Sequence, residues 1–263
     1  MSARRWSPPR RLIAVDGEVT NLPAAKRLIA AAVGEEPDAV LIRPSVRAQA
    51  VLAQLPDMSV VAVLPDLAQL LREVADRGAP RTVGSRLAAG GIPACWRLAR
   101  TGLRHLRDLM RQDFRGIVPV LIDLERARAG HGTPEGVALA APLTDLLLAA
   151  GYAECFAHLV AFLRESGTRA GFETQNLGQL LASLASWDVA PDFVIGPLNP
   201  RGFRMKPTPS AVLQAVAHTA IPVLASELTA AGTVPLAEGD AYAHQHGAAG
   251  VIVRADECAQ PTS

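Results

Sequence analysis

The sequence TRAGFETQN (Thr168–Asn176) is the first of four short apolar runs that each end in a cluster of polar residues. The other three runs are FVIGPLN (Phe193–Asn199), IPVLASE (Ile221–Glu227) and GVIVRAD (Gly250–Asp256). Helix-like segments separate the runs, and this alternation predicts right-handed βαβ units on a parallel sheet. Because ligands in such folds bind at the carboxyl ends of the strands, the polar ends of the runs predict where the functional site lies.

The same alternation of apolar runs and helix-like segments extends back to the N-terminal part of the chain. Strands are predicted at Arg11–Val15, Asp38–Arg43, Ser59–Leu64 and Ile117–Asp123. Helices are predicted at Leu22–Val33, Val46–Leu55, Leu67–Arg77, Pro134–Ala150 and Tyr152–Ser166. Apolar residues at three- and four-residue spacings in Ala94–Met110 predict an extra amphipathic helix, within an insertion around residues 80–115.

Eight strands in a chain of 263 residues favour an α/β fold of the (β/α)8 TIM-barrel type, which usually takes about 250 residues. We expect a single barrel domain over residues 11–256, with loosely held tails at 1–10 and 257–263 that lack apolar periodicity. An open doubly wound sheet is the alternative. No glycine-rich turn of the Rossmann or P-loop type follows a predicted strand, which favours the barrel.

The charge balance argues against two classes of partner. With 26 basic and 25 acidic residues, the net charge of +1 offers no broad field for nucleic acid or an anionic membrane, and we expect neither as a partner. The chain lacks the apolar segment of a signal peptide and the roughly 20 apolar residues of a membrane span, so a cytoplasmic location is predicted. Since soluble oligomers are commonly twofold, a homodimer is the expected assembly.

Polar residues at the predicted strand ends form the candidate site, because a barrel gathers the carboxyl ends of its strands around one mouth. These residues are Asp16, Glu18, Arg43, Asp66, Asp123, Glu125, Glu173, Gln175, Asn176, Asn199, Ser226 and Glu227. A strand alternates its faces, so each of the pairs Asp123/Glu125 and Glu173/Gln175 is expected to point inward together. Glu173, Asp123 and Glu125 are the predicted proton-transfer residues. The predicted substrate-binding residues are Asp16, Arg43, Gln175, Asn176, Asn199, Ser226 and Glu227.

The converging carboxylates could also ligate a divalent metal ion, because oxygen-rich clusters suit Mg²⁺ or Mn²⁺. His131, in the loop after Asp123 and Glu125, would then add a nitrogen ligand. No other cofactor is predicted. The alternative is that each acid caps the helix that follows it and pairs with a nearby arginine, since first helical turns favour acids.

The loop NPRGFRMKP (Asn199–Pro207) gathers Arg201, Arg204 and Lys206 directly after a predicted strand. The two arginines are predicted to clamp a carboxylate or phosphate of the substrate. If Lys206 reached an apolar barrel mouth, desolvation and the two arginines would lower its pKa, and a catalytic Schiff-base lysine would be conceivable. The alternative is a hydrated surface lysine.

The segment HLVAFLRESGTRAGFETQNLGQLLASLASWDVAPDFVIGPLNP (His158–Pro200) resembles the second half of aldo-keto reductases. There, a helix precedes a glycine-containing strand, a second helix and a strand that ends in Asn-Pro. The resemblance continues through IPVLASELTAAG to GAAGVIVRAD, covers roughly residues 155–256, and implies a TIM barrel.

The resemblance implies that an active member would carry a tetrad of Asp, Tyr, Lys and His. In such a tetrad the tyrosine protonates the substrate carbonyl while a nicotinamide supplies hydride. In this chain the only tyrosines, Tyr152 and Tyr242, lie in helical stretches, and neither lysine ends an early strand. We therefore expect a divergent barrel of this type that lacks the tetrad, and nicotinamide chemistry is not favoured.

Three functions compete on this evidence. The leading hypothesis is an enzyme for a small substrate with a carbonyl or carboxylate, in which strand-end acids transfer protons in lyase or isomerase chemistry. The second is a divergent aldo-keto oxidoreductase that uses NADPH without the tetrad. The third is a barrel without catalysis that binds partners in a larger assembly through the Ala94–Met110 helix.

Overall fold

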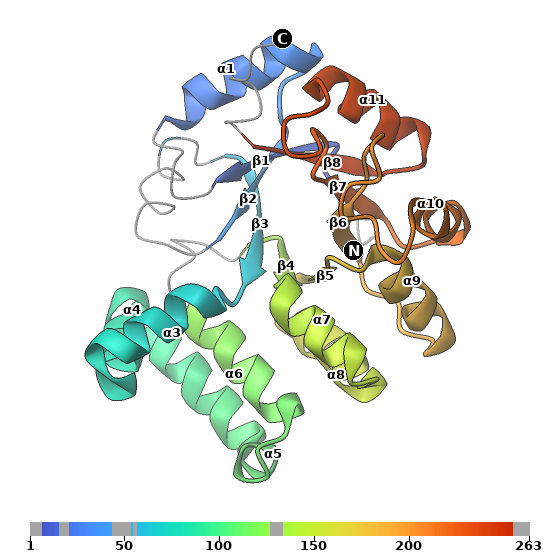
Figure 1. Cartoon of the computed structure of the whole chain (residues 1–263). Helices are drawn as coiled ribbons and strands as arrows, with labels where there is room; N and C mark the ends of the chain where they lie inside the picture. The colour runs from blue at the N-terminus through green and yellow to red at the C-terminus, as the bar shows by residue number, and fades with distance from the viewer. Residues whose placement is uncertain (1–6, 16–20, 44–53, 55–56, 127–133, 255–263) are drawn as a thin grey trace, which may run out of the picture.

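Eight parallel strands close into a barrel in chain order, which confirms the predicted (β/α)8 fold (Figure 1). The computed structural model describes residues 7–15, 21–43, 54, 57–126 and 134–254. The strands are β1 (Arg11–Val15), β2 (Ala39–Ile42), β3 (Ser59–Leu64), β4 (Gly136–Leu139), β5 (Arg169–Glu173), β6 (Phe193–Pro197), β7 (Val223–Ser226) and β8 (Gly250–Arg254). The last strand pairs with the first, so the sheet closes on itself.

Helices surround the barrel on its outer side (Figure 1). They are α1 (Leu22–Val33), α3 (Leu67–Arg77), α4 (Ala79–Arg104), α5 (Leu106–Met110), α6 (Phe114–Arg126), α7 (Ala141–Ala149), α8 (Ala153–Glu165), α9 (Leu177–Ser186), α10 (Pro209–His218) and α11 (Leu236–Gln245). The helix predicted at Val46–Leu55 lies, apart from Gln54, outside the described residues. Within the described ranges, no helix combines the length and the apolar character that a membrane crossing requires.

Local signals fix where several helices begin and end. Asn21 accepts a hydrogen bond from the Ala24 N–H at 3.0 Å and starts α1. That helix ends at Gly34, whose φ of 79° is a left-handed conformation that glycine adopts without strain. Asp66 accepts a hydrogen bond from the Gln69 N–H at 3.0 Å and starts α3. Asp66 thus has the helix-capping role that was the alternative to a place in the site.

Alternation along the strands separates a small barrel interior from the layer beneath the helices. Outward-facing residues such as Val40 and Ile42 belong to the large core under the helices, whereas Leu41 belongs to a separate cluster inside the barrel. Many inward positions carry alanine or glycine, and the Phe193 ring occupies the space that they leave. A Cβ on Gly171 would lie 2.4 Å from that ring. The interior is therefore filled by side chains.

The prediction of a strand at Ile117–Asp123 is wrong, because these residues lie in α6. The buried residues Val118 and Ile122 are four positions apart, as on one face of a helix, and α6 packs against α4 and α8. The fourth strand is instead β4, a buried run of only four residues with the sequence GVAL. β4 lies within the helix predicted at Pro134–Ala150, because its alanine and leucine are also common in helices. Only the later part of that range is helical, as α7.

Three helices, α4, α5 and α6, form the predicted insertion between β3 and β4, and they extend it to Arg126. Figure 1 shows them with α3 as a group beside the barrel. α4 is kinked at Gly91, whose φ of 64° and ψ of −164° interrupt the helix shortly before Pro93. The second half of α4 and the short α5 together contain the amphipathic helix predicted at Ala94–Met110.

Replacing Gly171 with alanine tests how tightly the interior is packed. The new methyl group would overlap the Phe193 ring, so we expect the free energy of unfolding to fall by about 1–3 kcal/mol in a urea titration. Adding Phe193→Leu to this variant should recover part of the loss. Gly84→Ala is the matched control, because a Cβ at Gly84 meets nothing within 4 Å. Equal losses in the two alanine variants would contradict the packing.

Candidate functional site

An ion pair between Arg43 and Glu173 spans the mouth of the barrel. Arg43 directly follows β2 and Glu173 ends β5, and these strands are separated in the sheet by β3 and β4. One terminal nitrogen of the guanidinium lies 2.5 Å from Glu173 Oε1, and the Ala141 N–H donates to Glu173 Oε2 at 3.1 Å. Since Ala141 begins α7 just after β4, groups from the ends of β2 and β4 converge on the carboxylate at the end of β5.

The two members of this pair differ in their access to solvent. The side chain of Glu173 is 12% exposed, whereas that of Arg43 is 41% exposed. The carboxylate is held away from bulk water, while the guanidinium stays within reach of a dissolved anion. A guanidinium can bind a carboxylate or phosphate through two parallel hydrogen bonds, so Arg43 could exchange its present partner for a ligand.

Both side chains point toward the barrel axis. Leu41 lies in the interior cluster and Gly171 faces the ring inside the barrel, so residues two positions later on the same strands share the inward direction. Arg43 and Glu173 are those residues. The expectation that Glu173 faces the mouth is in agreement with this geometry.

Two further polar residues end strands with the same inward direction. Ser226 ends β7 two positions after the interior residue Leu224, and Arg254 ends β8 two positions after Ile252. Ser226 is among the residues predicted from the sequence. Arg254 was missed, although the alternation in GVIVR would have placed it on the inward face. The mouth therefore combines two arginines, one acid and one hydroxyl.

The turn after β5 is held by Asp145 of α7. Its carboxylate accepts hydrogen bonds from Thr174 Oγ1 at 2.5 Å and from the Gln175 N–H at 3.1 Å. Thr174 Oγ1 also accepts a hydrogen bond from the Asn176 N–H at 2.9 Å. Gln175 and Asn176 are thus fixed through their backbones at the rim, with half-buried side chains. Asp145 carries no strand-end signal in the sequence, because it lies inside a helix.

Asn199 shapes the loop that follows β6. Its side chain is fully buried, donates to the Phe203 carbonyl and accepts from the Phe203 N–H, both at 2.9 Å. Arg204, next in the chain, lies over the Phe203 ring and forms an ion pair with Glu227 at 3.0 Å. The predicted substrate-binding residues Arg204 and Glu227 therefore meet at the rim, and Asn199 supports the loop that carries Arg204.

The remaining basic residues of this loop, Arg201 and Lys206, are exposed. The Lys206 carbonyl accepts a hydrogen bond from the Gly178 N–H at 3.2 Å, which anchors the loop to α9. The burial that a Schiff-base lysine would require is missing at Lys206, and its position matches the alternative of a hydrated surface lysine.

Asp123 and Glu125 do not lie at a strand end, because the strand predicted there is helix α6. Both side chains are 1% exposed. Glu125 forms a buried ion pair with Arg86 of α4, and Asp123 accepts a hydrogen bond from Thr101 Oγ1 at 2.6 Å. The two acids therefore join α6 to α4.

The same cluster lies near the amino-terminal ends of the strands, opposite the mouth. Asp123 is 3.7 Å from Arg126, which donates to Thr168 Oγ1 at 3.2 Å, and Thr168 directly precedes β5. Burial lowers the pKa of Arg126 from its ordinary value, and the Asp123 carboxylate opposes that shift. Asp123 and Glu125 are thus separated from Glu173, and the predicted grouping of the three acids at one mouth is wrong.

The metal hypothesis depended on His131 together with Asp123 and Glu125. His131, Asp16 and Glu18 lie outside the described residues, so their predicted roles stay predictions. Among the residues that the structure describes, no three His, Cys, Asp or Glu side chains are grouped so as to hold a metal ion.

Comparisons with known proteins do not identify a function, so the geometry of the site is the main evidence on it. The sequence matches no protein-family model and no curated protein. Among solved structures, the chain is similar to a 3-hexulose-6-phosphate synthase with a TM-score of 0.38 and 12% identity, over 95% of this chain and 97% of that chain. The description of the site does not depend on that likeness.

Substituting Glu125 distinguishes a structural acid from a catalytic one. Glu125→Ala would leave the Arg86 guanidinium buried without this partner, so we expect the free energy of unfolding to fall by about 3–5 kcal/mol. Glu165→Ala removes an acid whose ion pair with Arg104 is 54% exposed on both sides, and it should leave the urea midpoint almost unchanged. Similar urea midpoints for the two variants would contradict the buried role of Glu125.

Proposed function

We propose that the protein is an enzyme that acts on a small anionic substrate with a carbonyl group, by proton transfer at the mouth of the barrel. The observation that carries this proposal is the Arg43–Glu173 pair, in which a partly exposed guanidinium covers a largely buried carboxylate. In a TIM barrel, the carboxyl ends of the strands are where catalytic groups are found.

In this proposal the substrate anion takes the place of Glu173 on Arg43. The Glu173 carboxylate then abstracts a proton from the carbon next to the substrate carbonyl, and the electron pair of the broken C–H bond forms an enolate. The positive charge of Arg43 stabilises the negative charge that develops on the enolate oxygen. Return of the proton to a different position gives an isomerase. If the enolate instead re-forms the carbonyl and its electron pair makes a C=C bond, a hydroxyl or phosphate on the next carbon leaves with the electron pair of its C–O bond, and the reaction is that of a lyase.

The residues around the pair would supply substrate contacts. The Ser226 hydroxyl and the guanidinium of Arg254 share the inward direction of Glu173 and are suited to a hydroxyl and an anionic group of the substrate, respectively. Gln175 and Asn176, in the loop after β5, and Arg201, in the loop after β6, would add polar contacts at the rim. Arg204 is paired with Glu227, so the substrate would have to compete for it.

An oxidoreductase of the aldo-keto type is the competing proposal, and it rests on the sequence resemblance alone. Tyr152 lies just before α8 and Tyr242 lies within α11, so neither tyrosine ends a strand. Burial raises the pKa of Tyr242, which makes proton release from that phenol harder. A fluorescence titration with NADPH separates the two proposals, and saturable binding would favour the oxidoreductase.

Proton exchange with solvent tests the proposed chemistry without knowledge of the complete reaction. The protein is incubated in D₂O with a panel of small 2-oxo carboxylates and ketose phosphates, and the signal of the proton next to the carbonyl is followed by NMR. We expect protein-dependent loss of that signal for at least one compound. Glu173→Gln should slow the exchange by about 100-fold or more, because an amide cannot accept the proton.

Two controls make the exchange experiment decisive. Arg43→Ala should raise the substrate concentration needed for half-maximal exchange, because it removes the anion contact. Glu165→Gln, the same chemical change at an exposed site on α8, should leave the rate unchanged. Absence of exchange across the panel, or an unchanged rate in a folded Glu173→Gln variant, would contradict the proposal.

A further inference from the structure

The second half of α4 has its apolar and polar faces reversed with respect to the barrel. After the kink at Gly91, the side chains that this half of α4 and the residue after it bury are those of Ala94, Thr101 and His105, of which two are polar. Large apolar side chains point outward instead: Ile92 is 75% exposed, Trp96 70%, Leu103 74% and Met110 of α5 79%. An outward apolar face of this extent indicates a surface that binds another molecule.

The exposed residues follow a regular spacing along α4 and α5. They are Ile92, Trp96, Ala99, Leu103, Leu106 and Met110, separated by alternating steps of four and three residues. This is the spacing of the apolar positions of a coiled-coil heptad, in which one helix receives another along a narrow line. We call these six residues the α4 seam. At about 1.5 Å per residue, its part on α4, from Ile92 to Leu103, extends for about 17 Å. His105, with φ −105° and ψ 15°, separates this part from Leu106 and Met110 on α5.

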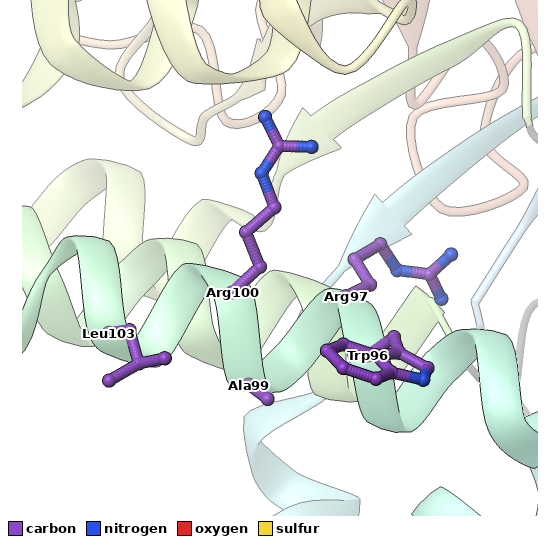
Figure 2. A pocket seen from close by; sticks show the side chains of 5 residues that line it. All are labelled: Trp96, Arg97, Ala99, Arg100 and Leu103. Atoms are coloured by element: carbon purple, nitrogen blue, oxygen red, sulfur yellow. The ribbon is translucent and has the colours of Figure 1, made fainter.

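A shallow groove follows the middle of the α4 seam. Its volume is about 500 Å³, and it is lined by Trp96, Arg97, Ala99, Arg100 and Leu103. Figure 2 shows Trp96, Ala99 and Leu103 in succession along α4, with Arg100 projecting from the same stretch. The small Ala99 between two large side chains leaves a notch, which is the shape that accepts a side chain from a facing helix.

The charged residues beside the α4 seam indicate which kind of molecule could bind there. Arg97 and Arg104 already have acidic neighbours, since Arg97 lies 3.6 Å from Asp123 and Arg104 lies 2.6 Å from Glu165. Arg100 and Arg107 flank the seam on one side. Among the described residues, neither guanidinium forms a close ion pair. Arg100 lies within electrostatic reach of Glu165, whose pKa is lowered chiefly by Arg104 and more weakly by Arg100.

The opposite flank of the α4 seam has no charged side chain. It consists of Cys95, Gly102 and Leu109. The charge that a facing helix meets along the seam is therefore positive and lies on one side. Complementary charge on the occupant requires acidic residues beside its own apolar line.

We propose that the α4 seam is a docking site for an acidic amphipathic helix of a partner protein. The partner would place apolar residues against Trp96, Ala99 and Leu103, and glutamate or aspartate against Arg100 and Arg107. A second copy of this chain fits less well, because two antiparallel seams would bring arginine against arginine. A membrane surface also fits less well, because interfacial helices present a broad apolar face and the seam is narrow.

The probe for this proposal is a pair of fluorescently labelled helical peptides of three heptads. Both have leucine at the two apolar heptad positions, and one has glutamate and the other lysine at the flanking positions. Like charges discourage each peptide from pairing with itself. Anisotropy titrations should show saturable binding of the glutamate peptide to the full chain and none of the lysine peptide, with affinity that falls as salt rises.

Substitutions on the exposed seam leave the barrel core untouched and identify the binding surface. Leu103→Glu should weaken binding of the glutamate peptide about tenfold or more, since it removes a central apolar contact. Leu28→Glu makes the same change at a 52% exposed leucine on α1 and should have no effect. The double substitution Arg100→Glu and Arg107→Glu should reverse the preference, so that the lysine peptide binds.

Each other outcome overturns the proposal. Equal binding of the two peptides, no binding of the glutamate peptide, or binding that Leu103→Glu leaves unchanged would show that the seam does not select an acidic helix. Concentration-dependent dimerisation in light scattering that Leu103→Glu abolishes would assign the seam to a second copy. Sedimentation with phosphatidylserine vesicles that depends on Leu103, without peptide binding, would assign it to a lipid surface.

Discussion

Pairing of β1 with β8 is the constraint on which the rest of the structure depends, because it closes the sheet. The approach of the two strands is close: a Cβ on Gly250 would lie 2.1 Å from the Pro9 carbonyl oxygen, so only glycine allows it without displacement of the backbone. Arg11 of β1 is buried and donates to both carboxylate oxygens of Asp240 on α11, at 2.9 and 3.0 Å. The first and last parts of the chain are thereby held together.

Closure of the barrel places different groups of residues at its two ends. The interior is filled by the Phe193 ring and by aliphatic side chains such as those of Leu41 and Leu224, so a ligand that enters from the carboxyl side meets the polar layer at the strand ends. In that layer Arg43 and Glu173, 130 positions apart in the sequence, are brought into contact. At the opposite end, the buried pair of Arg86 and Glu125 joins α4 to α6 within the helical insertion, and Arg126 of α6 donates a hydrogen bond to Thr168 just before β5. The apolar face of α4 stays on the outside.

The sequence was sufficient where local signals agreed with tertiary packing. Strands β1 and β3 have the predicted bounds, and Arg43 and Glu173 were placed correctly at strand ends. The strand predicted at Ile117–Asp123 was wrong because the β-branched residues there pack α6 against neighbouring helices. Such contacts between distant parts of the chain cannot be recognised from the local sequence pattern. For the same reason Asp123 was assigned to the mouth. Asp145 could not be predicted, since its role depends on the docking of α7 beside the turn after β5.

A double-mutant cycle on Arg43 and Glu173 tests most directly whether the closed barrel holds these two charges as one unit at its mouth. The free energies of unfolding of the Arg43→Ala, Glu173→Gln and doubly substituted chains are measured by urea titration against the unaltered protein. A coupling free energy of at least about 0.5 kcal/mol is expected for residues in contact. Additivity within about 0.3 kcal/mol would contradict the contact, and with it the proposed site.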